Sequence, residues 1–238
     1  MLPTVRTAPA SRGNRRRTIT DVTGDEDVAP AAARPPRSTS LPRHLGDHAV
    51  LVPVKSFVHA KQRLTTALGD DDRRALVRRM AEQVLRAAAP IPVAVVCDDP
   101  EVAEWARGHG AIVLWEPGRG LNGAVQSGVA QLAHRGVRRV VVAHADLPMA
   151  RDLARLVGFG GVTLVPDRRD DGTNVIELPA RAGFRFSYGP GSFARHRAEC
   201  DRLGIATRVV REPFLTYDVD WPSDLSELVR SADTDGQV

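Results

Sequence analysis

Short runs of β-branched and other apolar residues alternate with segments of helical periodicity from residue 49 onward, and this alternation constrains the fold most strongly. The first three runs are AVLVPV at 49–54, VAVVC at 93–97 and AIVLW at 111–115. Continuous apolar runs are typical of strands buried on both faces, as in parallel sheets. Strands that alternate with helices predict a mostly parallel sheet with helices on both faces, so the predicted fold class is α/β.

The intervening segments have the periodicity of amphipathic helices. Residues 69–89 begin with three acids and continue with apolar residues at helical spacing. Asp99 and Pro100 provide an N-cap and a first-turn proline for a second helix, which ends near Gly108 or Gly110. The further predicted strands are 138–146, 161–166, 174–178, 205–210 and 216–220, and the further predicted helices are 122–135, 149–158, 192–203 and 222–230.

The first 47 residues differ in composition from the rest of the chain. They contain eight Arg against five Asp and Glu, many Pro, Ala, Ser and Thr, and almost no periodic apolar pattern. Such a segment cannot bury enough surface to offset the entropy of the chain. We therefore predict a disordered tail over 1–47 and a single folded domain over 48–238.

The high Arg content does not indicate a nucleic-acid-binding protein. Of the net charge of +4, only +1 belongs to residues 48–238, which contain 25 basic and 24 acidic residues. No basic stripe is evident there. No apolar run approaches the roughly 18 residues of a membrane span, and Cys97 and Cys200 are too few for a disulfide framework. We expect a cytoplasmic protein that binds neither nucleic acid nor membrane.

Two lysines stand out in a chain that has 31 Arg. Lys55 and Lys61 lie in VPVKSFVHAKQRL (52–64), directly after the first predicted strand, and Arg63 follows them. Ligands of open α/β sheets bind beyond the carboxyl ends of the strands. Three cations at that place suit the phosphoryl oxygens of a polyphosphate, although a solvated basic loop explains the segment equally well.

The segment EPGRGLNGAVQSG (116–128) has Gly118, Gly120 and Gly123 in the spacing G-x-G-x-x-G, which is the fingerprint of a dinucleotide site. In dinucleotide-binding folds these glycines follow the first strand. Here they follow the third predicted strand, and 52–64 has no glycine. The sequence therefore disfavours an oxidoreductase that binds a nicotinamide or flavin dinucleotide.

Carboxylates follow two of the predicted strands. Asp146 ends VVVAHAD, and Asp218 and Asp220 in TYDVD would share one face of a strand. Carboxylate oxygens suit Mg²⁺, and two adjacent carboxylates repel each other unless a cation or a proton lies between them. The alternative is that Asp146 and one of the other two cap the helices that follow. His144, on the same strand face as Asp146, has no role that we can assign.

Two further segments suit a small anion. DDGTNV (171–176) places the hydroxyl of Thr173 in a turn, and SYGPGSFARH (187–196) places Gly189 shortly before Ser192, where a helix is predicted to begin. Free backbone N–H groups at a helix start bind anions, but an ordinary loop with an N-cap has the same pattern. His196 would lie on the same helix face as Ser192 and would reach the same pocket.

Six segments together resemble a known family. VPVKSFVHAKQRL, GLNGAVQSG, HADLP, DGTNV, SYGPGSFARH and TYDVDWPSDL occur in an order similar to that of the phosphoenolpyruvate or 2-phospho-L-lactate guanylyltransferases of coenzyme F-420 biosynthesis. The resemblance spans about residues 48–230. It implies a single-domain Rossmann-like nucleotidyltransferase fold, similar to GT-A glycosyltransferases, with a mixed, mostly parallel sheet flanked by helices.

The resemblance also implies roles for individual residues: ligands of one or two Mg²⁺ ions, ligands of the phosphorylated acid, and ligands of the nucleotide GTP. The ligands of Mg²⁺ would be Asp146, Asp218 and Asp220, and the ligands of the acid would be Thr173, Gly189 and Ser192. The ligands of GTP would be Lys55, Lys61, Arg63 and Asn122. Asp146, Lys55 and Lys61 would be the catalytic residues among them.

The implied reaction transfers GMP from GTP to the phosphate of phosphoenolpyruvate, giving enolpyruvoyl-2-diphospho-5'-guanosine and pyrophosphate. The Arg- and Ala-rich composition suggests a GC-rich bacterium, and the resemblance favours phosphoenolpyruvate because actinobacterial members of the family are associated with that acid. 2-Phospho-L-lactate, which would give lactyl-2-diphospho-5'-guanosine, and 3-phosphoglycerate are the alternative acids. The product would pass to a downstream transferase that adds the deazaflavin precursor. Rival hypotheses are a molybdopterin-dinucleotide or sugar-nucleotide synthase, which would have a glycine-rich first loop, and a non-catalytic nucleotide-binding protein.

Overall fold

A computed structural model describes residues 45–235 of the chain. The predicted tail over 1–47 lies outside the described residues except for its last three. Of these, Leu45 is buried in the core, and the backbone oxygen of Asp47 accepts hydrogen bonds from the N–H groups of Arg138 and Arg139. The boundary of the folded domain therefore stays a proposal, with Leu45 on its folded side.

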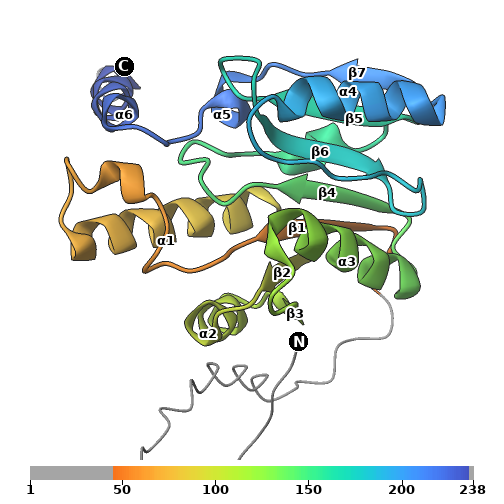
Figure 1. Ribbon diagram of the computed structural model, residues 1–238, viewed down its shortest axis with the longest axis horizontal. Helices are drawn as coiled ribbons and strands as arrows, with labels where there is room; N and C mark the ends of the chain where they lie inside the picture. Colours follow the sequence, from red (N-terminus) through yellow and green to blue (C-terminus); the bar gives the residue numbers. More distant parts are fainter. Residues whose placement is uncertain (1–44, 236–238) are drawn as a thin grey trace, which may run out of the picture. The chain divides into compact units, whose positions relative to one another are not determined.

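A seven-stranded mixed sheet forms the centre of the described residues (Figure 1), in the order β3-β2-β1-β4-β6-β5-β7. Strands β1 to β4 are parallel to one another, β6 runs antiparallel to both β4 and β5, and β7 is parallel to β5. The strands are β1 (His48–Pro53), β2 (Val93–Cys97), β3 (Ile112–Trp115), β4 (Arg139–Ala143), β5 (Val162–Pro166), β6 (Thr173–Pro179) and β7 (Thr207–Val209).

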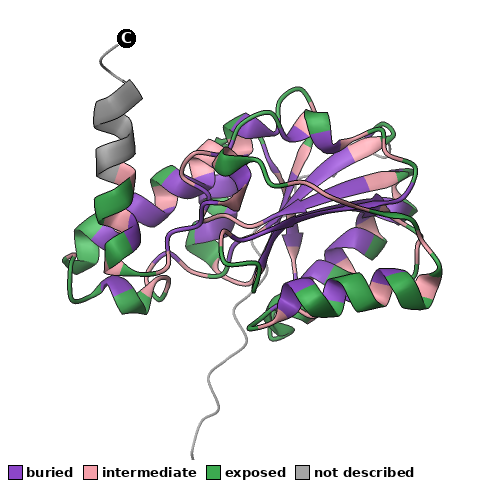
Figure 2. Ribbon diagram, turned by 90° about the horizontal axis from the view of Figure 1, so that it is seen from above, coloured by how far each residue is buried: buried purple, intermediate pink, exposed green. Residues whose placement is uncertain are grey.

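Helices cover both faces of the sheet, so the core has two parts (Figures 1 and 2). Helices α1 (Asp70–Ala87) and α2 (Pro100–Gly108) pack on one face, and α3 (Gly120–His134) and α4 (Ser192–Leu203) pack on the other. The remaining helical elements are η1 (Gln62–Leu64), η2 (Leu153–Leu156), α5 (Pro213–Thr216) and α6 (Pro222–Asp235). This arrangement confirms the predicted α/β class with a mixed, mostly parallel sheet.

Local sequence signals account for most of these elements. The apolar positions Leu76, Met80 and Val84 of α1 are buried against the sheet, as their helical spacing predicts. The side chain of Asp99 caps α2 by accepting hydrogen bonds from two backbone N–H groups of its first turn. None of the helices in the described part of the chain has both the length and the hydropathy of a membrane span.

Two predicted elements are wrong. The segment 149–158 forms only the short 3-10 helix η2, and the predicted strand 216–220 begins on the last residue of α5 and contains no strand. The backbone of this second segment finds other partners: Val219 N donates to Asp146 O, and Asp220 N donates to the carboxylate of Asp224. These contacts satisfy its N–H groups without a sheet neighbour, which alternating side chains alone do not reveal.

Candidate active site

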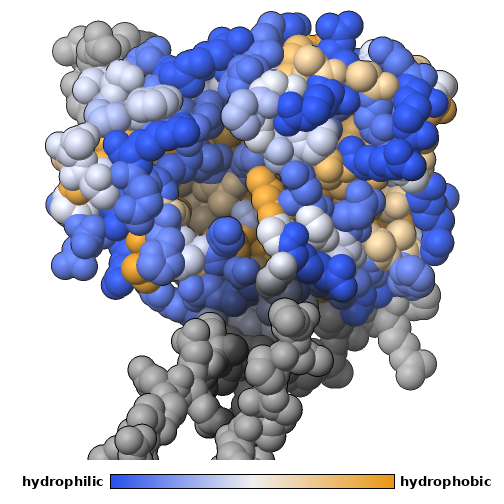
Figure 3. All heavy atoms as spheres, viewed as in Figure 1, coloured by the Kyte–Doolittle hydropathy of each residue, from blue (hydrophilic) through white to orange (hydrophobic). Residues whose placement is uncertain are grey.

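Three adjoining cavities lie at the carboxyl ends of the parallel strands, where open α/β sheets bind ligands. We call them the β2–β3 cavity (150 Å³), the β1 cavity (220 Å³) and the β4–β6 cavity (360 Å³). The first two share Lys55 and Leu121, and the last two share His144 and Asp146. Figure 3 shows a hollow with an apolar floor and a hydrophilic rim on the face where Figure 1 places these strand ends.

The antiparallel course of β6 builds the β4–β6 cavity. Because β6 runs opposite to β4, its first residues lie beside the carboxyl end of β4, and His144 N donates to Asn174 O at 3.0 Å. Thr173 therefore lies near Asp146, although 27 residues separate them in the sequence. The hydrogen bond from Val219 N to Asp146 O, at 3.3 Å, brings the loop that carries Asp218 and Asp220 to the same place.

All three predicted carboxylates, those of Asp146, Asp218 and Asp220, line the β4–β6 cavity. Lys61 Nζ lies 2.5 Å from Asp146 Oδ2 and forms a second ion pair with Asp220. Burial acts to lower the pKa of Lys61, but the two carboxylates outweigh burial and raise it. For Asp146, burial acts to raise the pKa, and the ammonium of Lys61 outweighs it and lowers the pKa. The lysine and Asp146 are therefore both charged at neutral pH.

Two carboxylate oxygens at this site have no partner. Oδ1 of Asp146 and Oδ1 of Asp218 are buried without a hydrogen bond, and burial, reinforced by the two neighbouring carboxylates, raises the pKa of Asp218 to about 6. Unpaired hard oxygens fit the ligand preference of Mg²⁺. However, within residues 45–235 no three acidic, His or Cys side chains are grouped as a metal site, and the ammonium of Lys61 contacts two of the carboxylates.

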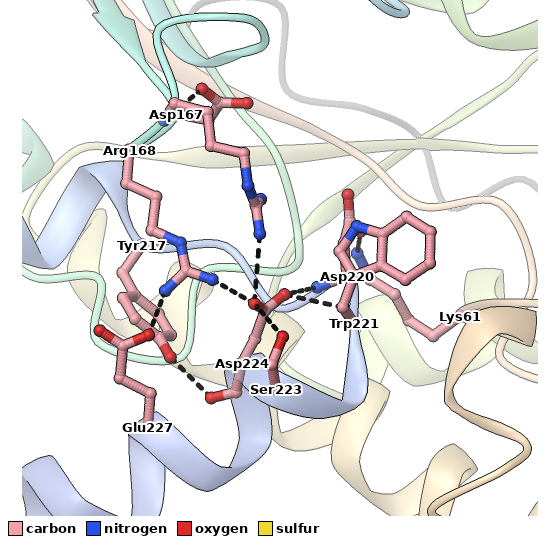
Figure 4. A network of polar contacts seen from close by, with 10 residues as sticks. Lys61, Asp167, Arg168, Tyr217, Asp220, Trp221, Ser223, Asp224 and Glu227 are labelled. Atoms are coloured by element: carbon pink, nitrogen blue, oxygen red, sulfur yellow. Dashed lines mark hydrogen bonds and ion pairs between the residues drawn. The ribbon is translucent and has the colours of Figure 1, made fainter.

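Asp224, which the sequence analysis did not single out, supports the loop that carries Asp218 and Asp220 (Figure 4). Its buried carboxylate accepts hydrogen bonds from the backbone N–H groups of Asp220 and Trp221, at 2.8 and 2.7 Å, and forms an ion pair with Arg168. The hydroxyl of Tyr217 donates to Asp224 O at 2.6 Å. The sequence feature that could have identified Asp224 is its position two residues after Pro222, because an acid in the first turn of a helix can accept hydrogen bonds from the N–H groups that precede the helix.

The predicted ligands of the acid also meet at this place. Thr173, Gly189 and Ser192 line the β4–β6 cavity, and the hydroxyls of Thr173 and Ser192 lie 3.4 Å apart. Three of the backbone N–H groups at the start of α4, where the sequence predicts free ones, already have acceptors. Gly191 N and Phe193 N donate to Asp171, and Ser192 N donates to Gly189 O. The two hydroxyls are therefore the better anion donors.

The four predicted nucleotide ligands are more dispersed. Lys55 is exposed and lines the β2–β3 and β1 cavities, and Lys61 lines the β1 cavity. Arg63 lines the β4–β6 cavity, with its guanidinium 4.6 Å from the ring centroid of Trp221, a residue that the sequence analysis did not consider. The side-chain amide of Asn122 exchanges two hydrogen bonds with the backbone of Tyr188, at 2.6 and 3.4 Å. Its role as a nucleotide ligand remains a prediction.

The β2–β3 cavity presents apolar side chains together with two carboxylates. Leu121 and Ala124 of α3 line it, as do Asp98 and Glu116. Glu116 is fixed in place, because its Oε1 accepts hydrogen bonds from Ser127 Oγ at 2.6 Å and Gln131 Nε2 at 2.5 Å, and its Oε2 lies 2.5 Å from Nε of the exposed Arg119. A flat ligand with N–H donors fits such a surface. Neither acid was singled out from the sequence, because each follows a strand as a loop acid does.

The sequence of this chain is similar to those of known guanylyltransferases. The sequence model of a family described as guanylyl transferase CofC like matches residues 48–236. A phosphoenolpyruvate guanylyltransferase of Sphaerobacter thermophilus is 39% identical over 191 residues, which cover 76% of this chain and 92% of the relative. A 2-phospho-L-lactate guanylyltransferase of Halorubrum lacusprofundi is 34% identical over 197 residues, which cover 79% of this chain and 86% of the relative.

The fold is also similar to that of solved nucleotide-handling enzymes. A protein of Desulfovibrio desulfuricans G20, described as a nucleotide-diphospho-sugar transferase, superposes with a TM-score of 0.64 at 18% identity, covering 78% of this chain and 87% of that one. A 4-diphosphocytidyl-2C-methyl-D-erythritol synthase superposes with a TM-score of 0.52 at 17% identity, covering 81% and 99%. The expected nucleotidyltransferase fold is confirmed.

Proposed function

This chain belongs to the guanylyl transferase CofC-like family and is a nucleotidyltransferase, and from that premise we propose that it transfers the guanylyl group of GTP to the phosphate of phosphoenolpyruvate. The products are enolpyruvoyl-2-diphospho-5'-guanosine and pyrophosphate. One observation supports this proposal above the others. The cavity with the carboxylates and the hydroxyls of Thr173 and Ser192 adjoins, through His144 and Asp146, the cavity with Lys55 and Lys61.

The three cavities suggest how the substrates are distributed. We place the guanine in the β2–β3 cavity, where Asp98 and Glu116 can accept hydrogen bonds from its N–H groups. The triphosphate then lies along the β1 cavity near Lys55 and Lys61, and the phosphorylated acid lies in the β4–β6 cavity. The reacting groups meet beside Asp146, which lines both of the latter cavities.

The choice of acid follows the relatives. Phosphoenolpyruvate is favoured because the relative of that name is the more similar of the two compared above, at 39% against 34% identity. 2-Phospho-L-lactate is the alternative, and the same site residues would serve either acid. The two acids share a three-carbon skeleton, with the phosphate and the carboxylate that the polar residues of the site would recognise, and differ only in whether the bond between C2 and C3 is double or single.

The residues of the chain act mainly on charge and orientation. A phosphate oxygen of the acid forms a bond to the α-phosphorus of GTP, and the bond from that phosphorus to the oxygen shared with the β-phosphate breaks. Lys55 and Lys61 offset the repulsion between the two anions, and Thr173 and Ser192 orient the acid by donating hydrogen bonds. No general base is required, because a phosphate monoester is largely ionised near pH 7.

Mg²⁺ completes the proposed site. Asp146, Asp218 and Asp220 would hold it, and when bound it would supply further neutralisation of phosphoryl charge. The fit is supported by the two unpaired buried oxygens of Asp146 and Asp218. Lys61 would exchange its present contacts with Asp146 and Asp220 for contacts with GTP phosphates, which its flexible ammonium can reach.

The test is an assay of pyrophosphate release from GTP with phosphoenolpyruvate, 2-phospho-L-lactate or 3-phosphoglycerate, with the downstream deazaflavin transferase present to consume a labile product. We expect the highest kcat/KM with phosphoenolpyruvate. GTP binding without pyrophosphate release from any acid would instead indicate a non-catalytic protein. Binding of a nicotinamide dinucleotide would indicate the oxidoreductase alternative.

We further propose that the protein works in the cytoplasm and delivers its product to that transferase. Support comes from the two cysteines, Cys97 and Cys200, which are buried free thiols, as expected in a reducing compartment. Fractionation of the native cells, followed by detection of the protein in the soluble cytoplasmic fraction, tests the location. Recovery in a membrane or periplasmic fraction would contradict it.

A further inference from the structure

The imidazole of His196 makes two hydrogen bonds that define its protonation. The residue lies on α4 and is fully buried. Its Nε2 accepts from the backbone N–H of Ser187 at 3.0 Å, and its Nδ1 lies 3.0 Å from Oγ1 of Thr173. Because a backbone N–H can only donate, Nε2 is the unprotonated nitrogen of a neutral ring. The proton is therefore on Nδ1, which donates to Thr173.

The surroundings of the ring hold it in this state. Burial, with smaller contributions from the neighbouring His144 and from the guanidinium of Arg195, lowers the pKa of His196 to about 4. The rings of Phe184 and Tyr188 pack against it, with centroid distances of 5.7 and 4.9 Å. His196 is therefore neutral and held in one orientation near pH 7.

The donation from His196 restricts the hydroxyl of Thr173. One lone pair of Oγ1 accepts the imidazole N–H, so the hydroxyl proton must point away from the ring. Ser192 Oγ, at 3.4 Å, is a weak partner at that distance. The proton remains for an acceptor in the β4–β6 cavity, which both hydroxyl residues line. A charged oxygen accepts more strongly than a neutral one.

We propose that His196 is a positioning residue that directs the hydroxyl of Thr173 toward an anionic oxygen of the phosphorylated acid. The inference rests on the proposed function, because it requires the acid to bind in the β4–β6 cavity. His196 is not among the residues that line this cavity, so it acts through Thr173. Loss of His196 should therefore weaken binding of the acid and leave binding of GTP unchanged.

Two substitutions separate the two hydrogen bonds of the ring. His196→Asn keeps a side-chain N–H near the position of Nδ1, and His196→Gln keeps a carbonyl near the position of Nε2 but no donor to Thr173. We expect His196→Gln to raise KM for phosphoenolpyruvate about tenfold and KM for GTP less than about twofold, the effect of one hydrogen bond to a charged group. His196→Asn should recover most of this loss. His134→Gln, at an exposed histidine of α3, is the matched control.

A double-mutant cycle tests whether the effect passes through Thr173. In the Thr173→Val background, His196→Gln should cause no further rise in KM for phosphoenolpyruvate. An equal tenfold rise in both backgrounds, or no rise in either, would overturn the inference while an active wild type upholds the proposed function. A wild type that releases no pyrophosphate with any acid would overturn both.

A spectroscopic measurement covers the case in which a variant does not fold. Long-range ¹H–¹⁵N correlation spectra of the full chain at pH 7 distinguish the two neutral tautomers, and correlations from the backbone of His196 to its ring assign the signal within the wild-type protein. The expected result is a neutral ring protonated on Nδ1. A ring protonated on Nε2 could not accept from Ser187 or donate to Thr173 as described, and would overturn the inference without reference to activity.

Discussion

Lys61 Nζ lies 2.5 Å from Asp146 Oδ2, across 85 residues of sequence. The backbone of Lys61 has a φ of 53°, in the left-handed region that a residue with a side chain seldom adopts. Such strain costs about 1 to 3 kcal/mol and is found where a site requires it. Here it accompanies the placement of an ammonium between the carboxylates of Asp146 and Asp220.

The first prediction concerns competition between this ammonium and Mg²⁺. We expect Lys61→Met to lower kcat by a factor on the order of 10² to 10³, because the variant lacks an electrostatic stabiliser of the reaction. The same variant should need less Mg²⁺ for half-maximal activity, since the cation no longer displaces an ammonium from two carboxylates. Initial rates over a Mg²⁺ titration measure both effects.

The control for this variant is Lys55→Met. Among the described residues Lys55 has no ion pair to a carboxylate that an ammonium could withhold from a metal. The Lys55→Met variant should therefore have a higher KM for GTP and nearly the same Mg²⁺ requirement as the wild type. A higher Mg²⁺ requirement for Lys61→Met than for the wild type would show that the lysine supports metal binding instead of competing with it.

The second prediction concerns removal of the metal or of its proposed ligand. EDTA should abolish pyrophosphate release, and excess Mg²⁺ should restore it. Asp146→Asn should lower kcat/KM by a factor on the order of 10² to 10³, whereas Asp201→Asn, at an exposed site on α4, should have no effect. Unchanged turnover in Asp146→Asn, measured in the same assay, would exclude the proposed metal site.

The third prediction compares two acids that contact the same arginine. Asp224 is buried, accepts two backbone N–H groups and pairs with Arg168, whereas Glu227 pairs with Arg168 at the surface. Asp224→Asn removes the charge from a buried acceptor of two backbone N–H groups, while Arg168 keeps its pair with Glu227, so it should lower the free energy of unfolding by about 2 kcal/mol. Glu227→Gln should lower it by less than about 1 kcal/mol. Urea denaturation measures both, and equal losses would contradict the assigned role of Asp224.

The sequence allowed prediction of the sheet more fully than of the site. Continuous apolar runs and helix caps located β2 and α4 to the residue, because these signals are local. The prediction that Asp218 and Asp220 lie together rested on a strand that does not exist, yet both line one cavity. Their loop is held by Asp224 and by the backbone of Asp146. Such tertiary hydrogen bonds join distant segments and leave no periodic pattern.

The fourth prediction distinguishes two glycines of α3. A Cβ added at Gly128 would lie 2.9 Å from the side chain of Leu51, which is fully buried in β1, whereas one at Gly123 would lie 3.2 Å from Cβ of Arg119. Alanine gains about 1 kcal/mol over glycine in a helix, but overpacking a core costs about 1 to 3 kcal/mol. Gly128→Ala should therefore be less stable than Gly123→Ala.

The outcome bears on the G-x-G-x-x-G pattern. If Gly128→Ala is the less stable variant, as expected, close packing of α3 on β1 requires glycine at 128, a position outside that pattern. Thermal denaturation of the two variants and the wild type measures the order of stability. A Gly123→Ala variant that is the less stable of the two would instead indicate that the last glycine of the pattern has a structural role here.

The last prediction follows from the low pKa of His196. Its value in the folded protein is about 4, below the ordinary 6.5, and burial is the main cause. Between these two pH values the unfolded chain binds more protons, so the free energy of unfolding falls as the pH falls from 6.5 toward 4. A shift of this size contributes about 3 kcal/mol. His196→Asn cannot titrate and should lose that much less stability over the same range. Urea denaturation at several pH values measures the free energy of unfolding of both proteins. The other titrating groups contribute equally to the two curves, so the difference between their slopes reports on His196 alone. Equal slopes would mean that His196 is not buried in the neutral form.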